Sequence, residues 1–192
     1  MNVVLASSSR WRAALLAEAG LPCTAVDPAL DEGAIIGENP VHTAVLRAQA
    51  KAEAVAVAHP DALVIGADQV IHLDGTPMGK PADDADWMFR LQLLRGRTHQ
   101  LTTGVAIVER GETETFHVDT AVRFRTDLTD DELGRYVAHG EARGCAGGYM
   151  IEKRGAWLVE GIDGDWLNVV GLPVLHLITC LRARGWRLPE QP

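Results

Sequence analysis

The fold class of this 192-residue chain is decided by Leu63-Val64-Ile65-Gly66-Ala67-Asp68-Gln69-Val70-Ile71-His72-Leu73. A continuous apolar run of this kind, closed by the turn dipeptide Asp74-Gly75, is typical of a strand buried on both faces of a sheet. Asp68 and Gln69 interrupt the run. Because an unpaired buried carboxylate is costly, we expect Asp68 to meet a cation or a metal ion, or to serve as a base. A structural ion pair is the alternative.

On either side of this strand, strand-like and helix-like segments alternate along the chain. Further strands are expected at 2–6, 24–26, 98–108 and 113–125, with two more short strands after the glycine-rich segment 144–148. Helices are expected at 11–19, 40–58, 82–94, 129–140 and 171–184, and a loop at 27–39. We therefore predict a mixed α/β fold, with residues 1–192 forming a single domain.

The composition excludes several classes of protein. Its 18 Lys and Arg against 26 Asp and Glu give a net charge of −8 without a basic cluster, so no nucleic acid polymer is expected as a partner. The longest apolar runs fall short of the roughly 20 residues of a membrane helix, so no membrane association is expected. Three cysteines without metal-ligand spacing and the lack of a signal-peptide pattern favour free thiols and a cytoplasmic location.

The turn after the first expected strand carries groups that could bind an anion. In Ser7-Ser8-Ser9-Arg10-Trp11-Arg12, hydroxyls, free N–H groups and guanidiniums converge where a helix begins. Trp11 adds an aromatic surface on which a base could stack. Ordinary helix capping with solvent-facing arginines explains the same residues, so both interpretations stay open.

Three charged residues elsewhere each allow two interpretations. Glu38 is either a charge favoured by the dipole of the following helix or an oxygen ligand for Mg²⁺. Lys51 lies about three turns into that helix, and considered by itself it is expected to be exposed to solvent. Lys80, in Gly79-Lys80-Pro81, could bring an ammonium group near Asp68. The glycines at 147–148 indicate either a close backbone approach or turns in the core.

In combination, these segments resemble the Maf-like family of nucleoside triphosphate pyrophosphatases over most of the chain. The resemblance rests on the order and spacing of Leu5-Ala6-Ser7-Ser8-Ser9-Arg10-Trp11-Arg12 with Leu15-Leu16, Glu38-Asn39-Pro40, Ala48-x-x-Lys51-Ala52, Gly66-Ala67-Asp68-Gln69-Val70, Gly79-Lys80-Pro81, Thr103-Gly104-Val105, Ala146-Gly147-Gly148-Tyr149 and Asn168-Val169-Val170-Gly171-Leu172-Pro173. It implies a central mixed sheet flanked by helices, related to the inosine triphosphatase (Maf/Ham1) type, with an active-site cleft between two lobes. It also implies that a small-molecule nucleoside triphosphate is hydrolysed to the monophosphate and pyrophosphate. The implied cofactor is a divalent cation, Mg²⁺, Mn²⁺ or Co²⁺.

The resemblance also implies roles for single residues. The implied catalytic residues are Asp68, Lys80, Lys51 and Arg12, and the implied phosphate-binding hydroxyls are those of Ser7 and Ser8. Asp68 would accept the proton of the water that attacks the α-phosphorus, and would share the metal with Glu38. This attack needs charge neutralisation, in-line positioning and one proton acceptor. The family often has an acid just before the helix lysine, but Ala50 stands there in this chain, so that position has no metal role.

Three positions bear on the substrate. Trp11, Gln69 and Glu152 resemble the subgroup that hydrolyses 7-methyl-GTP, whereas the dTTP and UTP subgroup usually has Arg, Thr and Gln there. Methylation at N7 makes guanine cationic, which favours stacking on Trp11. The carboxylate of Glu152 accepts hydrogen bonds only, and so suits the donor edge of guanine. Two alternatives remain: dTTP and UTP hydrolysis, and a regulatory binding protein, because Maf-like proteins are associated with inhibition of septum formation. A homodimer is the default state.

Overall fold

The structure is a computed structural model that describes residues 2–188, and its centre is one seven-stranded sheet. The strands are β1 (Val3–Ala6), β2 (Thr24–Val26), β3 (Leu63–Leu73), β4 (Thr76–Met78), β5 (Thr98–Glu109), β6 (Glu112–Phe124) and β7 (Val159–Asp163). Their order is β2-β1-β3-β5-β6-β7, with β4 paired to β3. β1 is parallel to β2 and β3, and the other pairs are antiparallel. The predicted mixed α/β class is confirmed.

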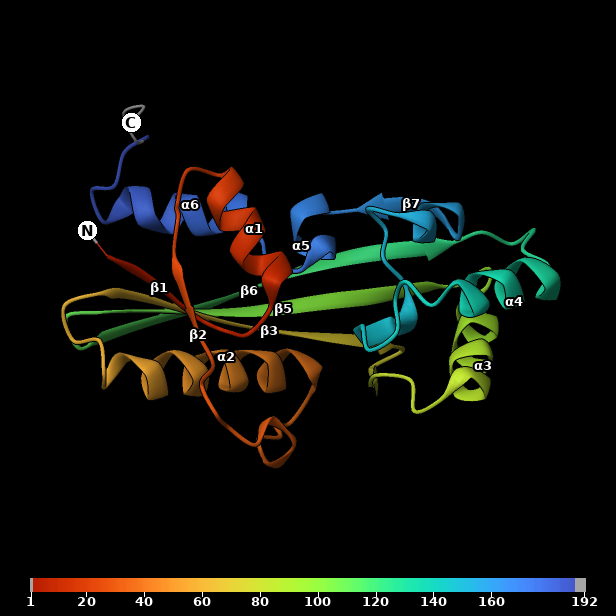
Figure 1. The fold of residues 1–192 in the computed structure, drawn as a ribbon, viewed down its shortest axis with the longest axis horizontal. Helices are drawn as coiled ribbons and strands as arrows, with labels where there is room; N and C mark the ends of the chain where they lie inside the picture. The colour runs from red at the N-terminus through yellow and green to blue at the C-terminus, as the bar shows by residue number, and fades with distance from the viewer. Residues whose placement is uncertain (1, 189–192) are drawn as a thin grey trace.

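Helices cover both faces of this sheet. They are α1 (Arg10–Glu18), α2 (Pro40–Ala56), α3 (Asp84–Leu94), α4 (Asp130–His139), α5 (Trp166–Val170) and α6 (Val174–Ala183), with 3-10 turns η1 (Glu32–Ala34), η2 (Ala146–Gly148) and η3 (Arg154–Trp157). α1 and α6 lie on one face and α2 on the other (Figure 1). Within residues 2–188, no helix is long and apolar enough to cross a membrane.

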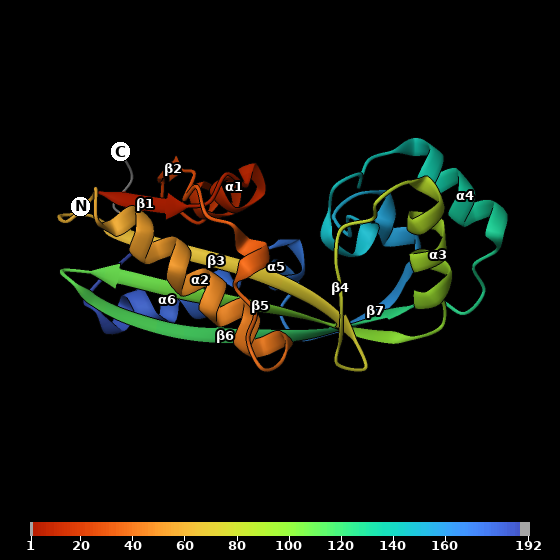
Figure 2. The same ribbon diagram turned by 90° about the horizontal axis from the view of Figure 1, so that it is seen from below.

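The molecule has two lobes joined by the long strands. Helices α1, α2 and α6 surround one end of β3, β5 and β6, which we call the first lobe, whereas α3, α4 and β7 form the second lobe at the other end (Figure 2). Each lobe has its own apolar core: Leu16 and Ile65 are central to one core of the first lobe, and Trp87 and Phe124 to that of the second. The strands therefore set the distance between the lobes.

Two strand glycines let α2 lie directly on the sheet. A Cβ atom at Gly66 would come within 2.2 Å of the carbonyl oxygen of Ala48, and one at Gly104 within 2.4 Å of that of Ala44. Real Cβ contacts are never this short, so both positions require glycine while α2 stays where it is. This close approach brings the middle of α2, with Lys51, onto β3.

Several helix ends follow the signals in the sequence. Asn39 caps α2 by accepting a 2.8 Å hydrogen bond from the backbone N–H of His42, and Pro40 occupies the first turn. Thr129 and Glu132 form a capping box at the start of α4, and Gly140 ends that helix with φ = 75°.

The segment after residue 144 differs from expectation. Of the two short strands predicted there, one forms, β7, which begins only at Val159. The apolar stretch 149–151 is not a strand, because Gly147 and Gly148 have φ of 76° and 70° and turn the chain into the core. The final helix starts at Val174 rather than 171, since Gly171 (φ 139°) ends an unpredicted helix, α5.

Candidate active site

A cleft of about 620 Å³ opens between the two lobes. Its walls come from the β1–α1 turn, the middle of β3, the inner face of α2 and the segment 144–152. It contains these predicted site residues: Ser7, Ser8, Trp11, Arg12, Lys51, Asp68, Gln69, Lys80 and Glu152. A larger cavity of about 820 Å³ lies between α4 and η3 but contains none of them, so we place the site in the cleft.

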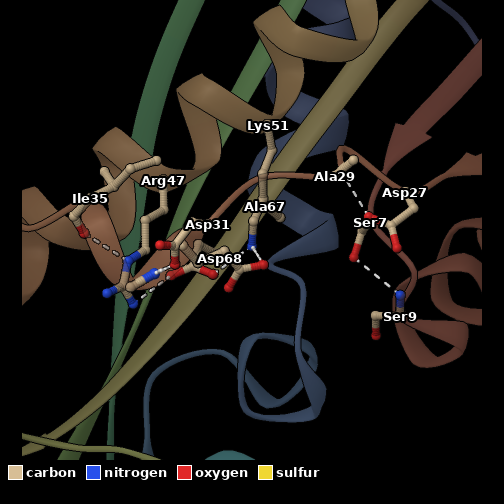
Figure 3. Close-up of polar contacts among 12 residues, drawn as sticks. Ser7, Ser9, Asp27, Ala29, Asp31, Ile35, Arg47, Lys51, Ala67 and Asp68 are labelled. Carbon is tan, nitrogen blue, oxygen red and sulfur yellow. Dashed lines mark hydrogen bonds and ion pairs between the residues drawn. The ribbon is translucent and has the colours of Figure 1, made fainter.

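Asp68 and Lys51 form the centre of the cleft. The Nζ of Lys51 lies 2.7 Å from Oδ1 of Asp68 (Figure 3). It also lies 2.9 Å from Oε1 of Glu32. Both Lys51 and Asp68 are buried. The ion pair that the sequence left as an alternative therefore exists. The second carboxylate oxygen of Asp68, Oδ2, is also buried and has no hydrogen-bond partner among residues 2–188.

Arg12 joins three segments at the edge of the cleft. Its Nε donates to the carbonyl of Gly171 (3.0 Å), and its Nη1 donates to the carbonyl of Ala67 (2.8 Å) and to Oγ of Ser7 (3.3 Å). Burial lowers the pKa of this guanidinium, and the charges of Asp68 and Glu32 act in the opposite direction. Arg12 therefore fixes the β1–α1 turn against β3, in addition to any contact with phosphate.

The serines of the turn divide into structural and free hydroxyls. Ser7 is buried, and its Oγ accepts from the backbone N–H of Ser9 at 3.2 Å as well as from Arg12. Ser9, not predicted as a site residue, is the N-cap of α1. Ser8 is exposed at the cleft and is the serine best placed to reach a bound phosphate. Helix capping therefore describes Ser9, whereas anion binding remains open for Ser8.

Trp11 and Glu152 mark the other end of the cleft. The ring centroid of Trp11 lies 4.5 Å from Cζ of Arg10 and 5.0 Å from Nζ of Lys153. Glu152 precedes Lys153 and is exposed at the cleft, so the indole and the carboxylate share this end. Gln69 is more constrained, because its Nε2 donates to the carbonyl of Asn168 (2.7 Å) and to Oγ1 of Thr103 (3.0 Å). Its amide oxygen remains as an acceptor.

Side chains of the second lobe hold the segment that carries Glu152. Nε1 of Trp87 donates to the carbonyl of Gly148 at 2.6 Å, and the backbone N–H of Met150 donates to Oη of Tyr136 at 3.0 Å. Oη of Tyr149 lies 2.8 Å from Nε2 of His99. Burial raises the pKa of Tyr149 and lowers that of His99 to about 4, so this pair is neutral at pH 7.

Glu38 is the one predicted site residue that the structure does not bring to the cleft. It is exposed, and its backbone N–H donates to Nδ1 of His42 at 3.4 Å. Glu32, on η1, takes the place next to Lys51 instead. Nothing in the acidic loop 27–39 distinguishes Glu32 from its neighbours. A second omission, Arg47, could have been found, since it precedes Lys51 by four residues and so shares its helix face.

The donors in the cleft fit a divalent cation that the substrate helps to bind. No group of three or more His, Cys, Asp or Glu in residues 2–188 could hold a metal ion by itself. Glu32 and Asp68 nevertheless supply two carboxylates on either side of Lys51. Mg²⁺ commonly takes one or two carboxylates and completes its shell with water and phosphate oxygens. These residues therefore suit a metal-nucleotide complex.

Comparisons with known proteins show the family of this chain. Residues 2–184 match the family described as Maf-like protein, and the chain belongs to that family. A dTTP/UTP pyrophosphatase of Moorella thermoacetica is 46% identical over 186 residues, which cover 96% of this chain and 95% of that protein. One of Symbiobacterium thermophilum is 41% identical, covering 96% and 95%. A 7-methyl-GTP pyrophosphatase of Aromatoleum aromaticum is 43% identical over 191 residues, covering 98% of each.

A solved structure supports the architecture. A HAM1 protein of Coxiella burnetii matches with a TM-score of 0.53 over 95% of this chain and 99% of that one, at 17% identity. This likeness concerns the fold alone and agrees with the expected inosine triphosphatase-like type.

Proposed function

We propose that this chain, a nucleoside triphosphate pyrophosphatase of the Maf-like family, converts 7-methyl-GTP to 7-methyl-GMP and pyrophosphate. The observation that carries the choice of base is that Trp11 and Glu152 both line the cleft, with Lys153, the neighbour of Glu152, against the ring of Trp11. The ring of Trp11 already has two cations against it, Arg10 and Lys153. A positively charged 7-methylguanine can replace one of them on the same surface.

Glu152 supports the same choice through hydrogen bonding. An ionised carboxylate only accepts hydrogen bonds, and the Watson–Crick edge of guanine offers two adjacent donors, N1–H and the N2 amino group. Uracil and thymine offer one donor between two acceptors, which a carboxylate satisfies poorly. Since Glu152 has no ion pair or hydrogen bond within residues 2–188, it is available to a base.

In the proposed reaction, Asp68 is the proton acceptor. The oxygen of a water molecule forms a bond to the α-phosphorus, while the bond from that phosphorus to the oxygen bridging to the β-phosphate breaks. Pyrophosphate leaves with the bonding electrons, and the proton of the water passes to Oδ2 of Asp68, the buried oxygen without a partner. Lys51 holds the other oxygen and orients the carboxylate.

A divalent cation is part of this proposal. Glu32 and Asp68 would hold it together with phosphate oxygens, and when bound it would neutralise charge on the triphosphate. Ser8 and the first N–H groups of α1 would contact the phosphates near the nucleoside. Lys80, exposed at the cleft, adds positive charge.

Hydrolysis of dTTP and UTP is the second candidate. It is favoured by the relatives of Moorella thermoacetica and Symbiobacterium thermophilum, whose names state that activity. A regulatory binding role remains the alternative of another class, and no feature of the cleft favours it.

The test is pyrophosphate release from 7-methyl-GTP, GTP, dTTP and UTP with Mg²⁺ or Mn²⁺. We expect 7-methyl-GTP to have the highest kcat/KM, and Trp11→Ala to lower it by about tenfold or more. Trp157→Ala is the matched control, because Trp157 is 80% exposed and lies outside the cleft. Preference for dTTP or UTP would support the second candidate. Absence of release from all four would contradict an enzymatic role and favour the binding protein.

The three cysteines support a reducing compartment. Cys23, Cys145 and Cys180 are all free thiols, which agrees with the proposed cytoplasmic location. The proposed homodimer is testable by light scattering of the intact chain.

A further inference from the structure

Arg47 lies inside the cleft but has no role in the reaction as described so far. It sits four residues before Lys51 on α2, so the two side chains share one helix face. Its side chain is 23% exposed and forms part of the cleft wall. It stands outside the quoted motif Ala48-x-x-Lys51-Ala52, and only its spacing from Lys51 indicates it.

The contacts of Arg47 fix its guanidinium and leave most of its donors unused. Nε donates to the carbonyl of Ile35 at 2.9 Å. Nη1 lies 3.7 Å from Oδ2 of Asp68, which is too long for a hydrogen bond. Among residues 2–188, the terminal nitrogens of Arg47 therefore donate no hydrogen bond, although they face a cleft. A fixed guanidinium with free donors suits an oxyanion that binds through two oxygens.

The charges at the centre of the cleft also require a further cation. Lys51 contacts two carboxylates, Asp68 and Glu32, so its single charge is more than balanced. Lys51 alone cannot neutralise a triphosphate. Arg47 is a further cation beside this group, and its Nη1 lies 3.7 Å from the same Oδ2 that would accept the proton.

The position of Arg47 indicates which part of the substrate it would meet. In Figure 3, Arg47 and Ser7 lie on opposite sides of Asp68. The turn of Ser7 continues into α1 and Trp11, the end assigned to the base. A triphosphate whose α-phosphorus lies at Asp68 therefore has its nucleoside on the side of Ser7 and its two outer phosphates on the side of Arg47.

We propose that Arg47 binds the pyrophosphate half of the substrate and holds it as the leaving group. This assignment rests on the proposed pyrophosphatase reaction, but it does not depend on which base is read. The guanidinium fork would contact oxygens of the β- and γ-phosphates, where negative charge increases as the bond to the α-phosphorus breaks. Arg47 would thus act on the leaving group while Asp68 acts on the water.

Calorimetric titration of the intact protein in Mg²⁺ buffer tests this without turnover. The ligands are inorganic pyrophosphate and, separately, the monophosphates 7-methyl-GMP and UMP. Arg47→Met should weaken pyrophosphate binding by about tenfold or more, because it removes a charged, two-pronged donor. Arg47→Lys, which keeps the charge and loses the fork, should weaken it by about threefold. Binding of the monophosphate should change by less than about twofold in both variants.

Arg184→Met is the matched control. Arg184 is also a half-buried arginine, but it pairs with Glu109 and Glu114 outside the cleft, so pyrophosphate binding should not change. Thermal unfolding of each variant checks that the fold is intact.

Two outcomes would overturn the assignment. One is wild-type affinity for pyrophosphate in Arg47→Met. The other is an equal loss for pyrophosphate and monophosphate, since that would mean that Arg47 only anchors the loop at Ile35. Failure of the proposed function is recognised separately, as absence of pyrophosphate release by the wild-type protein, and this titration remains informative in that case.

Discussion

Lys51 donates a 2.7 Å hydrogen bond to Asp68 and so joins α2 to β3 inside the cleft. Both residues are buried, and α2 approaches β3 this closely because Gly66 has no side chain. The same bond therefore contributes to the fold and orients the residue proposed as the base.

Asp68→Asn should abolish most of the turnover and leave the fold intact. The amide oxygen can still accept from Lys51, which also keeps Glu32 as a partner. An amide cannot accept the proton of the attacking water, so the rate of pyrophosphate release should fall by about 10²- to 10⁴-fold. Asp61→Asn, at an exposed position, is the control. Wild-type turnover in Asp68→Asn would mean that another group is the base.

Lys51→Met should lose both stability and activity. It leaves the carboxylate of Asp68 buried beside a methionine, with only the 3.7 Å approach of Arg47 for compensation. Removing one partner of a buried ion pair should lower the free energy of unfolding by about 3 kcal/mol. Denaturant titrations of Lys51→Met and Asp68→Asn provide the comparison. Wild-type stability in Lys51→Met would mean that the ion pair does not contribute to folding.

Gly66→Ala should destabilise the protein through a single added carbon. The new Cβ would meet the carbonyl of Ala48, which forces α2 away from β3. We expect a loss of about 2 kcal/mol in unfolding free energy, together with lower turnover because Lys51 moves with the helix. Gly134→Ala in α4 is the control: nothing lies within 4 Å of its Cβ, so it should be stabilised by up to about 1 kcal/mol.

Glu152→Gln should change the ranking of substrates. Replacing an acceptor-only group by an amide removes one of two acceptors for guanine and adds a donor that suits uracil or thymine. The kcat/KM ratio of 7-methyl-GTP to UTP should fall by about tenfold. Glu112→Gln, on the exposed start of β6, should leave the ratio unchanged. An unaltered ratio in Glu152→Gln would remove the base-reading role from this residue.

His99 should make the protein less stable in mild acid. Burial lowers its pKa in the folded protein to about 4, below the ordinary value of about 6.5 in the unfolded chain. Between these two pH values the unfolded state binds more protons, so stability is constant above about pH 6.5 and falls as the pH decreases towards 4, by about 3 kcal/mol in all. Urea titrations at pH 7 and pH 5 measure the fall. In His99→Gln, the loss of unfolding free energy between pH 7 and pH 5 should be smaller by the contribution of this histidine. An unchanged loss would mean that other groups cause the acid sensitivity.

The sequence predicted the elements that have strong local signals. The apolar run 63–73 forms β3 with the same bounds, and the helix beginning at Pro40 starts where its cap and its proline indicate. One of the two short strands expected after 144–148 does not form, and the predicted start of the last helix was wrong, because positive-φ glycines at 147, 148 and 171 override an apolar pattern. The hydrophobic pattern alone does not predict such a turn.

The site was predicted less completely than the fold, for a geometric reason. Asp68, Lys51 and Trp11 stand in recognisable motifs, and the structure brings all three to one cleft. Glu32 occupies the position expected of Glu38, because the path of the loop 27–39 depends on tertiary contacts such as the one between Arg47 and the carbonyl of Ile35. Neither residue lies in a pattern that local sequence determines.

The anchoring of the segment 147–153 limits how base preference can be altered. Its backbone and its tyrosine are held by Trp87, Tyr136 and His99, which lie outside it in the sequence. A chimera that received this segment from a relative with a different substrate preference would acquire new side chains. It would lack the residues of that relative that hold the segment in position. Redesign of specificity in this protein therefore has to exchange the segment and its three supports as one unit.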